Sequence, residues 1–159
     1  MNDMIKSQIV RLVNKHKTRD PFDIAFGENI IVVREPLGSI YGYYSKYVRQ
    51  PFIHVNSDLD KRSQIFTCCH ELGHAVIHAD SNTQFLRYET FFSVDRLERQ
   101  ANSFAAELLI SDDDIKQFFG TGLCISRVAK ELQVREIFVE YKIKNMSVDY
   151  LDHKTEYMI

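Results

Sequence analysis

The stretch that decides the fold is Phe66-Thr-Cys-Cys-His-Glu-Leu-Gly-His-Ala-Val-Ile-His78. If it forms a helix, His70 and His74 lie one turn apart on one face, about 6 Å along the axis, so both imidazoles can reach one small cation. Glu71 points toward the same opening without having to be a ligand. Two histidines and a glutamate at this spacing are the signature of zinc hydrolases, in which the glutamate is the general base.

An ordinary helix is the second interpretation of the same residues. His70 and His74 would then be half-buried histidines on an amphipathic helix, which is a common environment for His. His78 lies on the same stripe but about 12 Å from His70 along the axis, so one zinc ion does not bind all three. We expect His78 to be a helix C-terminal residue that interacts with the helix dipole. A third ligand has to decide between the two interpretations.

The third ligand is expected on a helix predicted over residues 94–110. Glu98 would complete a His₂Glu set and leave the fourth position for water. Asn102, one turn later, could accept a hydrogen bond from the non-ligating ring nitrogen of a ligand histidine. Glu98 could equally be a solvated helix acid, which is the usual environment of Glu. The rival carboxylates are Glu89, Asp95 and Glu107.

Small residues on both predicted helices favour a close approach between them. Gly73, Ala101 and Ala105 would leave room for the facing backbone. Cys68 and Cys69 fall within the first of these helices, and the third cysteine is distant, so the chain has no disulfide framework. We expect both adjacent cysteines to be small, buried packing residues.

The composition indicates one compact domain and argues against several classes of function. With 159 residues, 45% of them hydrophobic, and with 8 Tyr and 11 Phe, the chain can build a core. A net charge of −2 offers no electrostatic footprint for nucleic acid, so we expect no direct nucleic-acid contact. No apolar run is long enough to cross a bilayer, and the polar N-terminus is not a signal peptide. We therefore expect no membrane association and a cytoplasmic location.

Hydrophobic periodicity and turn residues divide the chain into short strands and helices. The predicted strands are 29–34, 39–44 and 52–55. The predicted helices are 2–17, a short helix from the Asp20 cap to Gly27, 59–79, 94–110, 111–119, 125–132 and 137–143. The connection over residues 80–93 is long and rich in aromatic residues, which is typical of functional loops, although these aromatics could equally pin it to the core.

Two stretches carry a family pattern. They are Phe66–His78 and Leu97-Glu-Arg-Gln-Ala-Asn-Ser-Phe-Ala-Ala-Glu-Leu-Leu109. They resemble the HELGH helix and the E-x-x-A-(N/S)-x-F-A-x-x-L-L helix of the ImmA/IrrE family of metallopeptidases, and Ile53-His-Val-Asn56 resembles that family's strand ending in Asn. The resemblance covers about residues 20–143 and is closest to the short, free-standing ImmA type. Ile110-Ser111 stands where many members have Pro, a departure that touches a helix boundary and not the metal.

The resemblance implies His70, His74 and Glu98 as zinc ligands and Glu71 as the catalytic base. Glu98 followed by Asn102 is similar to the gluzincin pattern of a ligand Glu and an Asp that orients a ligand histidine, with Asn here in place of Asp. Mn²⁺ and Fe²⁺ fit the same ligands, so the metal is left open. We expect a further group that stabilises the oxyanion from residues 80–93, with Tyr88 as the example.

The predicted fold class is α+β. We expect a small, mainly antiparallel three-stranded sheet packed on a zincin-like helical core, followed by C-terminal helices. The chain is expected to divide into a zincin-like metallopeptidase domain over residues 1–110, a helical lobe over 111–145 and a flexible tail over 146–159.

The resemblance implies that a cytoplasmic anti-repressor protease cleaves a helix-turn-helix repressor of a phage, a mobile element or a stress regulon. Because the chain begins almost directly with the peptidase domain, the repressor is expected to be a separate protein. Residues 125–143 have the length of a helix-turn-helix, but their second helix carries Glu136 and Glu140 and few base-reading groups. We therefore expect a packing lobe that recognises the repressor. The alternative function is a zinc-bearing anti-repressor that binds its partner without cutting it.

Overall fold

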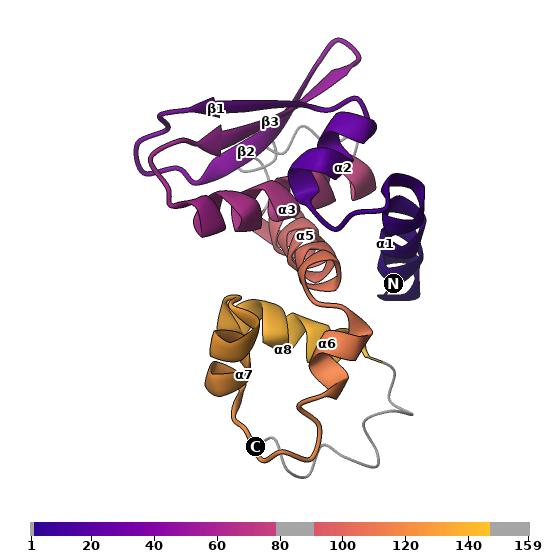
Figure 1. Ribbon diagram of the computed structural model, residues 1–159. Helices are drawn as coiled ribbons and strands as arrows, with labels where there is room; N and C mark the ends of the chain where they lie inside the picture. The colour runs from indigo at the N-terminus through magenta and orange to yellow at the C-terminus, as the bar shows by residue number, and fades with distance from the viewer. Residues whose placement is uncertain (1, 79–90, 147–159) are drawn as a thin grey trace.

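The structure is a computed structural model and describes residues 2–78 and 91–146. The helices are α1 Asn2–His16, α2 Pro21–Gly27, α3 Lys61–Ile77, α5 Phe91–Leu109, α6 Asp112–Lys116, α7 Ile125–Leu132 and α8 Glu136–Asn145, and the strands are β1 Ile31–Glu35, β2 Gly42–Tyr47 and β3 Gln50–Asn56. Figure 1 shows the sheet above α3, α5 below it, and α6, α7 and α8 beyond the end of α5. Helix α3 is the central element, because it packs against α2, β2, β3 and α5. No helix within these ranges is long and apolar enough to span a membrane.

The three strands form a mixed sheet with the order β1-β3-β2. A tight hairpin through Val48 and Arg49 joins β2 to β3, so these two strands are antiparallel. Strand β3 lies between β1 and β2 and runs parallel to β1, with Ile31 opposite Phe52. The predicted α+β class and the three-stranded sheet are confirmed. The expectation of a mainly antiparallel sheet is corrected, because one of the two pairings is parallel and the periodicity of a single strand does not reveal its neighbour.

Asn56, at the end of β3, holds the segment that precedes β2. Its side chain is buried, and its Nδ2 donates hydrogen bonds to the carbonyl oxygens of Gly38 (3.0 Å) and Ile40 (2.9 Å). Its Oδ1 accepts from the backbone N–H groups of Leu37 (3.3 Å) and Asp58 (3.0 Å). One side-chain amide therefore uses both donor hydrogens and both acceptor lone pairs to set the path of this segment.

Helix α3 begins where Asp60 caps it, by accepting hydrogen bonds from two backbone N–H groups of its first turn. Its inner face consists of Cys68, Cys69 and Leu72, none of which has exposed surface. The predicted burial of both cysteines is confirmed, and neither forms a disulfide. Burial raises the pKa of both thiols, so they remain protonated and act as small apolar groups.

A buried ion-pair network attaches α8 to α5 and α6. The Nζ of Lys142 lies 2.6 Å from Glu107 Oε2 and 2.6 Å from Asp112 Oδ1. Lys6, on α1, pairs with the other oxygen of Asp112 at 2.7 Å. Lys142 is 1% exposed and Glu107 is 4% exposed, so their charges are stabilised by each other and not by water.

Helix α6 is shorter than the helix predicted over residues 111–119. It opens with the predicted cap, in which Ser111 and Asp114 form a reciprocal capping box. It ends at Lys116, because the N–H groups of Phe118 and Phe119 bond to carbonyls three residues earlier and turn the chain.

One hydrophobic core joins the two parts of the chain that the sequence suggested on either side of residue 110. Leu72 and Phe104 belong to the same buried cluster as Val128 and Phe138. The division into residues 1–110 and 111–145 stays a prediction. Of the predicted tail, Met146 is buried, and residues 147–159 lie outside the described part of the chain.

Candidate metal centre

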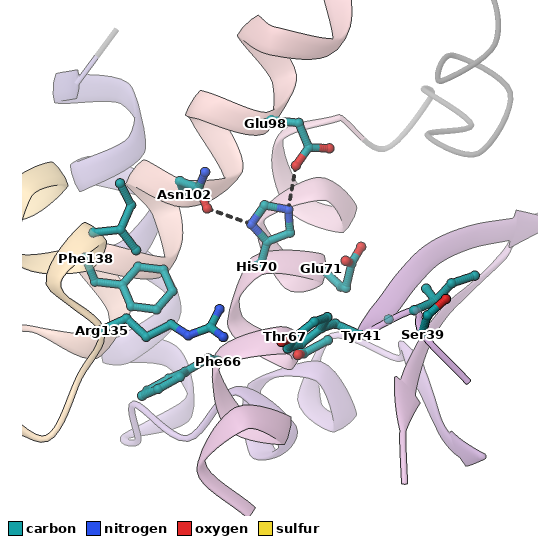
Figure 2. A pocket seen from close by; sticks show the side chains of 13 residues that line it. Ser39, Tyr41, Phe66, Thr67, His70, Glu71, Glu98, Asn102, Arg135 and Phe138 are labelled. Carbon is teal, nitrogen blue, oxygen red and sulfur yellow. Dashed lines mark hydrogen bonds and ion pairs between the residues drawn. The ribbon is translucent and has the colours of Figure 1, made fainter. Parts of the chain in front are cut away.

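The three predicted ligands meet at one point between α3 and α5. Their ligand atoms all lie within 4.8 Å of one another. His70 Nε2 and His74 Nε2 are 3.2 Å apart. Glu98 Oε2 lies 3.0 Å from His70 Nε2, and Glu98 Oε1 lies 3.4 Å from His74 Nε2. Figure 2 shows His70 directed toward Glu98 across the gap between the two helices.

The rival carboxylates do not compete with Glu98 within the described structure. Glu107 lies farther along α5 and pairs with Lys142. Glu89 lies outside the described residues, as does the side chain of Asp95.

Asn102 lies beside the first of the predicted ligands. Its Oδ1 is 3.0 Å from His70 Nδ1 (Figure 2). Because an amide oxygen only accepts, the hydrogen lies on His70 Nδ1, which leaves Nε2 with a free lone pair toward Glu98. This is the orientation that a metal-binding histidine needs.

The hydrogen-bonding roles of two buried side chains behind His74, His78 and Gln100, were not predicted from the sequence. His78 Nδ1 lies 3.2 Å from His74 Nδ1, and His78 Nε2 lies 2.9 Å from Gln100 Oε1. His78 is the C-cap residue of α3, as expected. Burial lowers its pKa, however, so it is a neutral hydrogen-bonding group and not a cation at the helix dipole. The signal in the sequence is the spacing of four residues between His74 and His78.

The close approach of the two helices depends on Gly73. A Cβ atom at this position would lie 3.1 Å from Ala101 Cα and 3.1 Å from Phe104 Cβ. Ala101 and Ala105 have no exposed surface. The predicted close contact between small residues is confirmed, and it brings Glu98 within reach of both histidines.

The electrostatics of the site favour a carboxylate anion beside imidazoles. When no metal is bound, burial acts to raise the pKa of Glu98, but its contacts with the imidazoles of His70 and His74 hold this pKa well below its ordinary value. Burial likewise acts to lower the pKa of His70, yet the contact with Glu98 and the charges of Glu71 and Glu98 raise it overall. Two imidazole nitrogens and one carboxylate, with their donor atoms converging, fit the donor set of a catalytic zinc site.

His70 and Glu98, two members of the cluster, line a cavity of about 440 Å³. Residues from α3 and α5 line one wall, which we call the metal wall, and they include the buried Glu71. Residues 39–42 and the first residues of α8 line the other, which we call the facing wall. Glu71 therefore lies beside the cluster and within the cavity, where a reacting group would bind.

A model described as IrrE N-terminal-like domain, which represents a peptidase family, matches residues 27–144. The chain belongs to this family. Among curated proteins, it is 39% identical over 127 residues to the Uncharacterized immunity region protein 2 of Bacillus phage phi105, over 79% of this chain and 80% of that protein. It is 27% identical over 146 residues to Metallopeptidase ImmA of Bacillus subtilis strain 168, over 89% of this chain and 85% of that protein. The predicted ImmA/IrrE membership is confirmed.

In this IrrE-like domain, the facing wall contains a positively charged side chain, Arg135, that was not predicted from the sequence. Arg135, just before α8, lines the cavity, and its Cζ lies 5.4 Å from the centre of the Tyr41 ring. Figure 2 shows the guanidinium directed toward the space below His70. Tyr88, the predicted oxyanion stabiliser, lies outside the described residues. The sequence pattern did not single out Arg135, because only the packing of α8 brings its side chain to the cavity.

Proposed function

We propose that this chain is a zinc-dependent endopeptidase that acts as an anti-repressor, by cleaving a helix-turn-helix repressor of a phage, a mobile element or a stress regulon. The observation that carries the proposal is the convergence of His70, His74 and Glu98 beside a cavity that His70, Glu71 and Glu98 line. Membership of a metallopeptidase family supports the same chemistry.

His70, His74 and Glu98 are the residues that would hold the metal, and Asn102 would orient His70. Zinc, when bound, supplies a Lewis acid that polarises the scissile carbonyl and lowers the pKa of water toward about 7. Mn²⁺ and Fe²⁺ accept the same nitrogen and oxygen donors, so metal analysis of the purified protein is part of the test.

Glu71 is the proposed general base. Its side chain is buried at the cavity lining, next in sequence to one predicted ligand and one turn from another. It takes a proton from the attacking water and gives this proton to the amine that leaves when the peptide bond breaks.

The choice of a repressor as substrate rests on the relatives. One is named an immunity region protein of a phage, and the other is named metallopeptidase ImmA. The net charge of −2 supports a protein substrate and not direct binding to DNA. Because a repressor acts on DNA in the cytoplasm, the reaction is proposed to take place there.

The test uses candidate helix-turn-helix repressors, beginning with any that a gene neighbouring this one encodes. The purified, zinc-loaded protein is incubated with each candidate, with and without a chelator, and the fragments are identified by mass spectrometry. Glu71→Gln is expected to keep zinc and to lose about 10²–10⁴-fold in cleavage rate. Asp3→Asn, which changes an exposed residue of α1, is the control and is expected to cleave like the wild type. If Glu71→Gln inactivates the repressor as well as the wild type does, the protein acts by binding alone and the peptidase proposal is wrong.

A further inference from the structure

A buried line of hydrogen bonds leads from the metal cluster into the core. His74 is 2% exposed, and His78 and Gln100 are each 7% exposed. His74 Nδ1 faces His78 Nδ1 at 3.2 Å, and His78 Nε2 faces Gln100 Oε1 at 2.9 Å. The line joins the C-terminal end of α3 to α5 and is separate from the contact between His70 and Asn102.

The donor and the acceptor of each hydrogen bond in this line follow from its last member, the amide oxygen of Gln100. An amide oxygen only accepts, so His78 Nε2 must carry the hydrogen that Gln100 Oε1 receives. A neutral imidazole has one hydrogen, so His78 Nδ1 has a lone pair and accepts from His74 Nδ1. The hydrogen of His74 is thereby held on Nδ1, and its Nε2, which faces Glu98 and His70, keeps a free lone pair.

The opposite arrangement carries a clear energetic penalty. If His74 had its hydrogen on Nε2, His78 would have to donate from Nδ1, and its Nε2 would present a lone pair to Gln100 Oε1. With the Gln100 amide in its present orientation, two acceptors would then face each other at 2.9 Å in a buried place, where neither is satisfied.

We propose that His78 and Gln100 are positioning residues that hold His74 ready to bind the metal through Nε2. Asn102 alone orients His70 through one hydrogen bond. His74 is oriented by two residues, because His78 bonds to His74 and Gln100 bonds to His78. The inference rests on the proposed metal site, but it concerns metal affinity and is independent of the substrate. Partners that orient a metal-binding histidine typically change metal affinity by about 10–100-fold when they are removed.

The test measures the zinc affinity of the full chain by competition with a chromophoric chelator. His78→Leu removes the acceptor and is expected to weaken zinc binding about 10–100-fold. His78→Gln restores an acceptor oxygen and a donor N–H, and is expected to recover most of the affinity. Gln100→Met leaves His78 in place without its acceptor and is expected to lose less than His78→Leu. The control is His16→Gln, which removes a histidine at the end of α1 that is hydrogen-bonded to Glu28, away from the site.

A second measurement separates positioning from general packing. Nitrogen-15 NMR of the zinc-loaded protein reports which ring nitrogen of His78 carries the hydrogen. We expect it on Nε2 in the wild type, and we expect Gln100→Met to lose this preference while the fold remains intact by circular dichroism. A His78 hydrogen on Nδ1 in the wild type would overturn the inference, and so would wild-type zinc affinity in His78→Leu. If the wild-type chain itself binds no zinc, the proposed metal site fails and this inference falls with it.

Discussion

The two walls of the cavity are held in place in different ways. On the metal wall, His70 and Glu71 lie within one turn of His74 on α3, and one helix-to-helix contact at Gly73 brings Glu98 to them. On the facing wall, residues 39–42 and the start of α8 come from segments that are far apart in the chain. The metal wall is therefore determined mostly by local geometry, and the facing wall depends on long-range packing.

Two buried polar side chains, Asn56 and Lys142, keep the segments of the facing wall in place. Asn56 bonds to four backbone groups and sets the path of residues 37–40. Lys142 pairs with Glu107 and Asp112 and so attaches α8 to α5 and α6. This difference indicates that the chemistry of the metal wall and the recognition of a substrate by the facing wall can be separated. A substitution that disrupts one wall should leave the function of the other wall intact.

The largest expected effect comes from removing the buried cation behind the facing wall. Lys142→Met leaves Glu107 as an unpaired buried charge, so we expect a loss of about 3–5 kcal/mol in the free energy of unfolding, measured by urea denaturation. Zinc affinity of the folded protein should stay at the wild-type value. The double variant Lys142→Met/Glu107→Met should recover most of the stability, whereas Lys144→Met, on the exposed face of α8, should lose little. A loss below about 1 kcal/mol in Lys142→Met would contradict this role for the network.

The next effect concerns the metal wall. Gly73→Val places side-chain atoms against Ala101 and Phe104, where even a Cβ has only 3.1 Å of room. We expect a loss of about 1–3 kcal/mol in stability, because the core cannot expand without shifting α5. Zinc affinity should fall as well, since the shift moves Glu98 away from the histidines. Lys61→Ala, at an exposed position of α3, is the control. Unchanged zinc affinity in a clearly destabilised Gly73→Val would show that the cluster tolerates a wider spacing.

The third prediction is a dependence of stability on pH. Burial acts to raise the pKa of Asp112, but its hydrogen bonds to Lys142 and Lys6 lower it to about 2. A carboxyl group whose folded pKa is lowered stabilises the fold above its unfolded pKa near 3.8, and this stabilisation is lost as the pH falls toward 2. With allowance for solvent screening, Asp112→Asn should cost about 1–2 kcal/mol at neutral pH and almost nothing at pH 2. Urea titrations with a chelator present exclude metal release, and a constant difference across this range would refute the assignment.

The smallest expected effect on stability comes from the cation of the facing wall. Arg135→Gln changes an exposed side chain, so the free energy of unfolding should change by less than about 0.5 kcal/mol and zinc affinity should not change. If the guanidinium hydrogen-bonds to the substrate, kcat/KM should fall roughly tenfold or more, because a charge-assisted hydrogen bond contributes about 1.5–3 kcal/mol. Arg11→Gln, an exposed change on α1, is the matched control. Equal cleavage by the two variants would remove Arg135 from substrate binding.

Helix α3 could be predicted from the sequence, because the residues that define it are neighbours in sequence or lie about one helical turn apart. The spacing of His70 and His74, the small residue at Gly73 and the buried pair Cys68 and Cys69 follow from helical geometry once the element is recognised. The choice of Glu98 over its rivals was open until the family pattern was considered. The sequence did not exclude Glu107 as a ligand, because its buried ion-pair partner Lys142 lies on α8, far along the chain.

The direction of β3 and the role of His78 could not be predicted in this way. A strand pattern shows which side chains share a face but not which strand lies beside it, so the parallel pairing with β1 was missed. His78 was expected at the helix dipole because the sequence shows its place on α3 but not Gln100 behind it.

The sequence by itself determined that His70 and His74 share one face of a helix, because side chains four residues apart converge without help from the rest of the fold. The family pattern pointed to Glu98. Only the tertiary structure decided which partners orient the two histidines and that Arg135 and Tyr41 line the same cavity as His70. The physical reason is distance along the chain. Local spacing follows from backbone geometry, whereas contacts between remote segments depend on how buried groups such as Asn56, Gly73 and Lys142 pack.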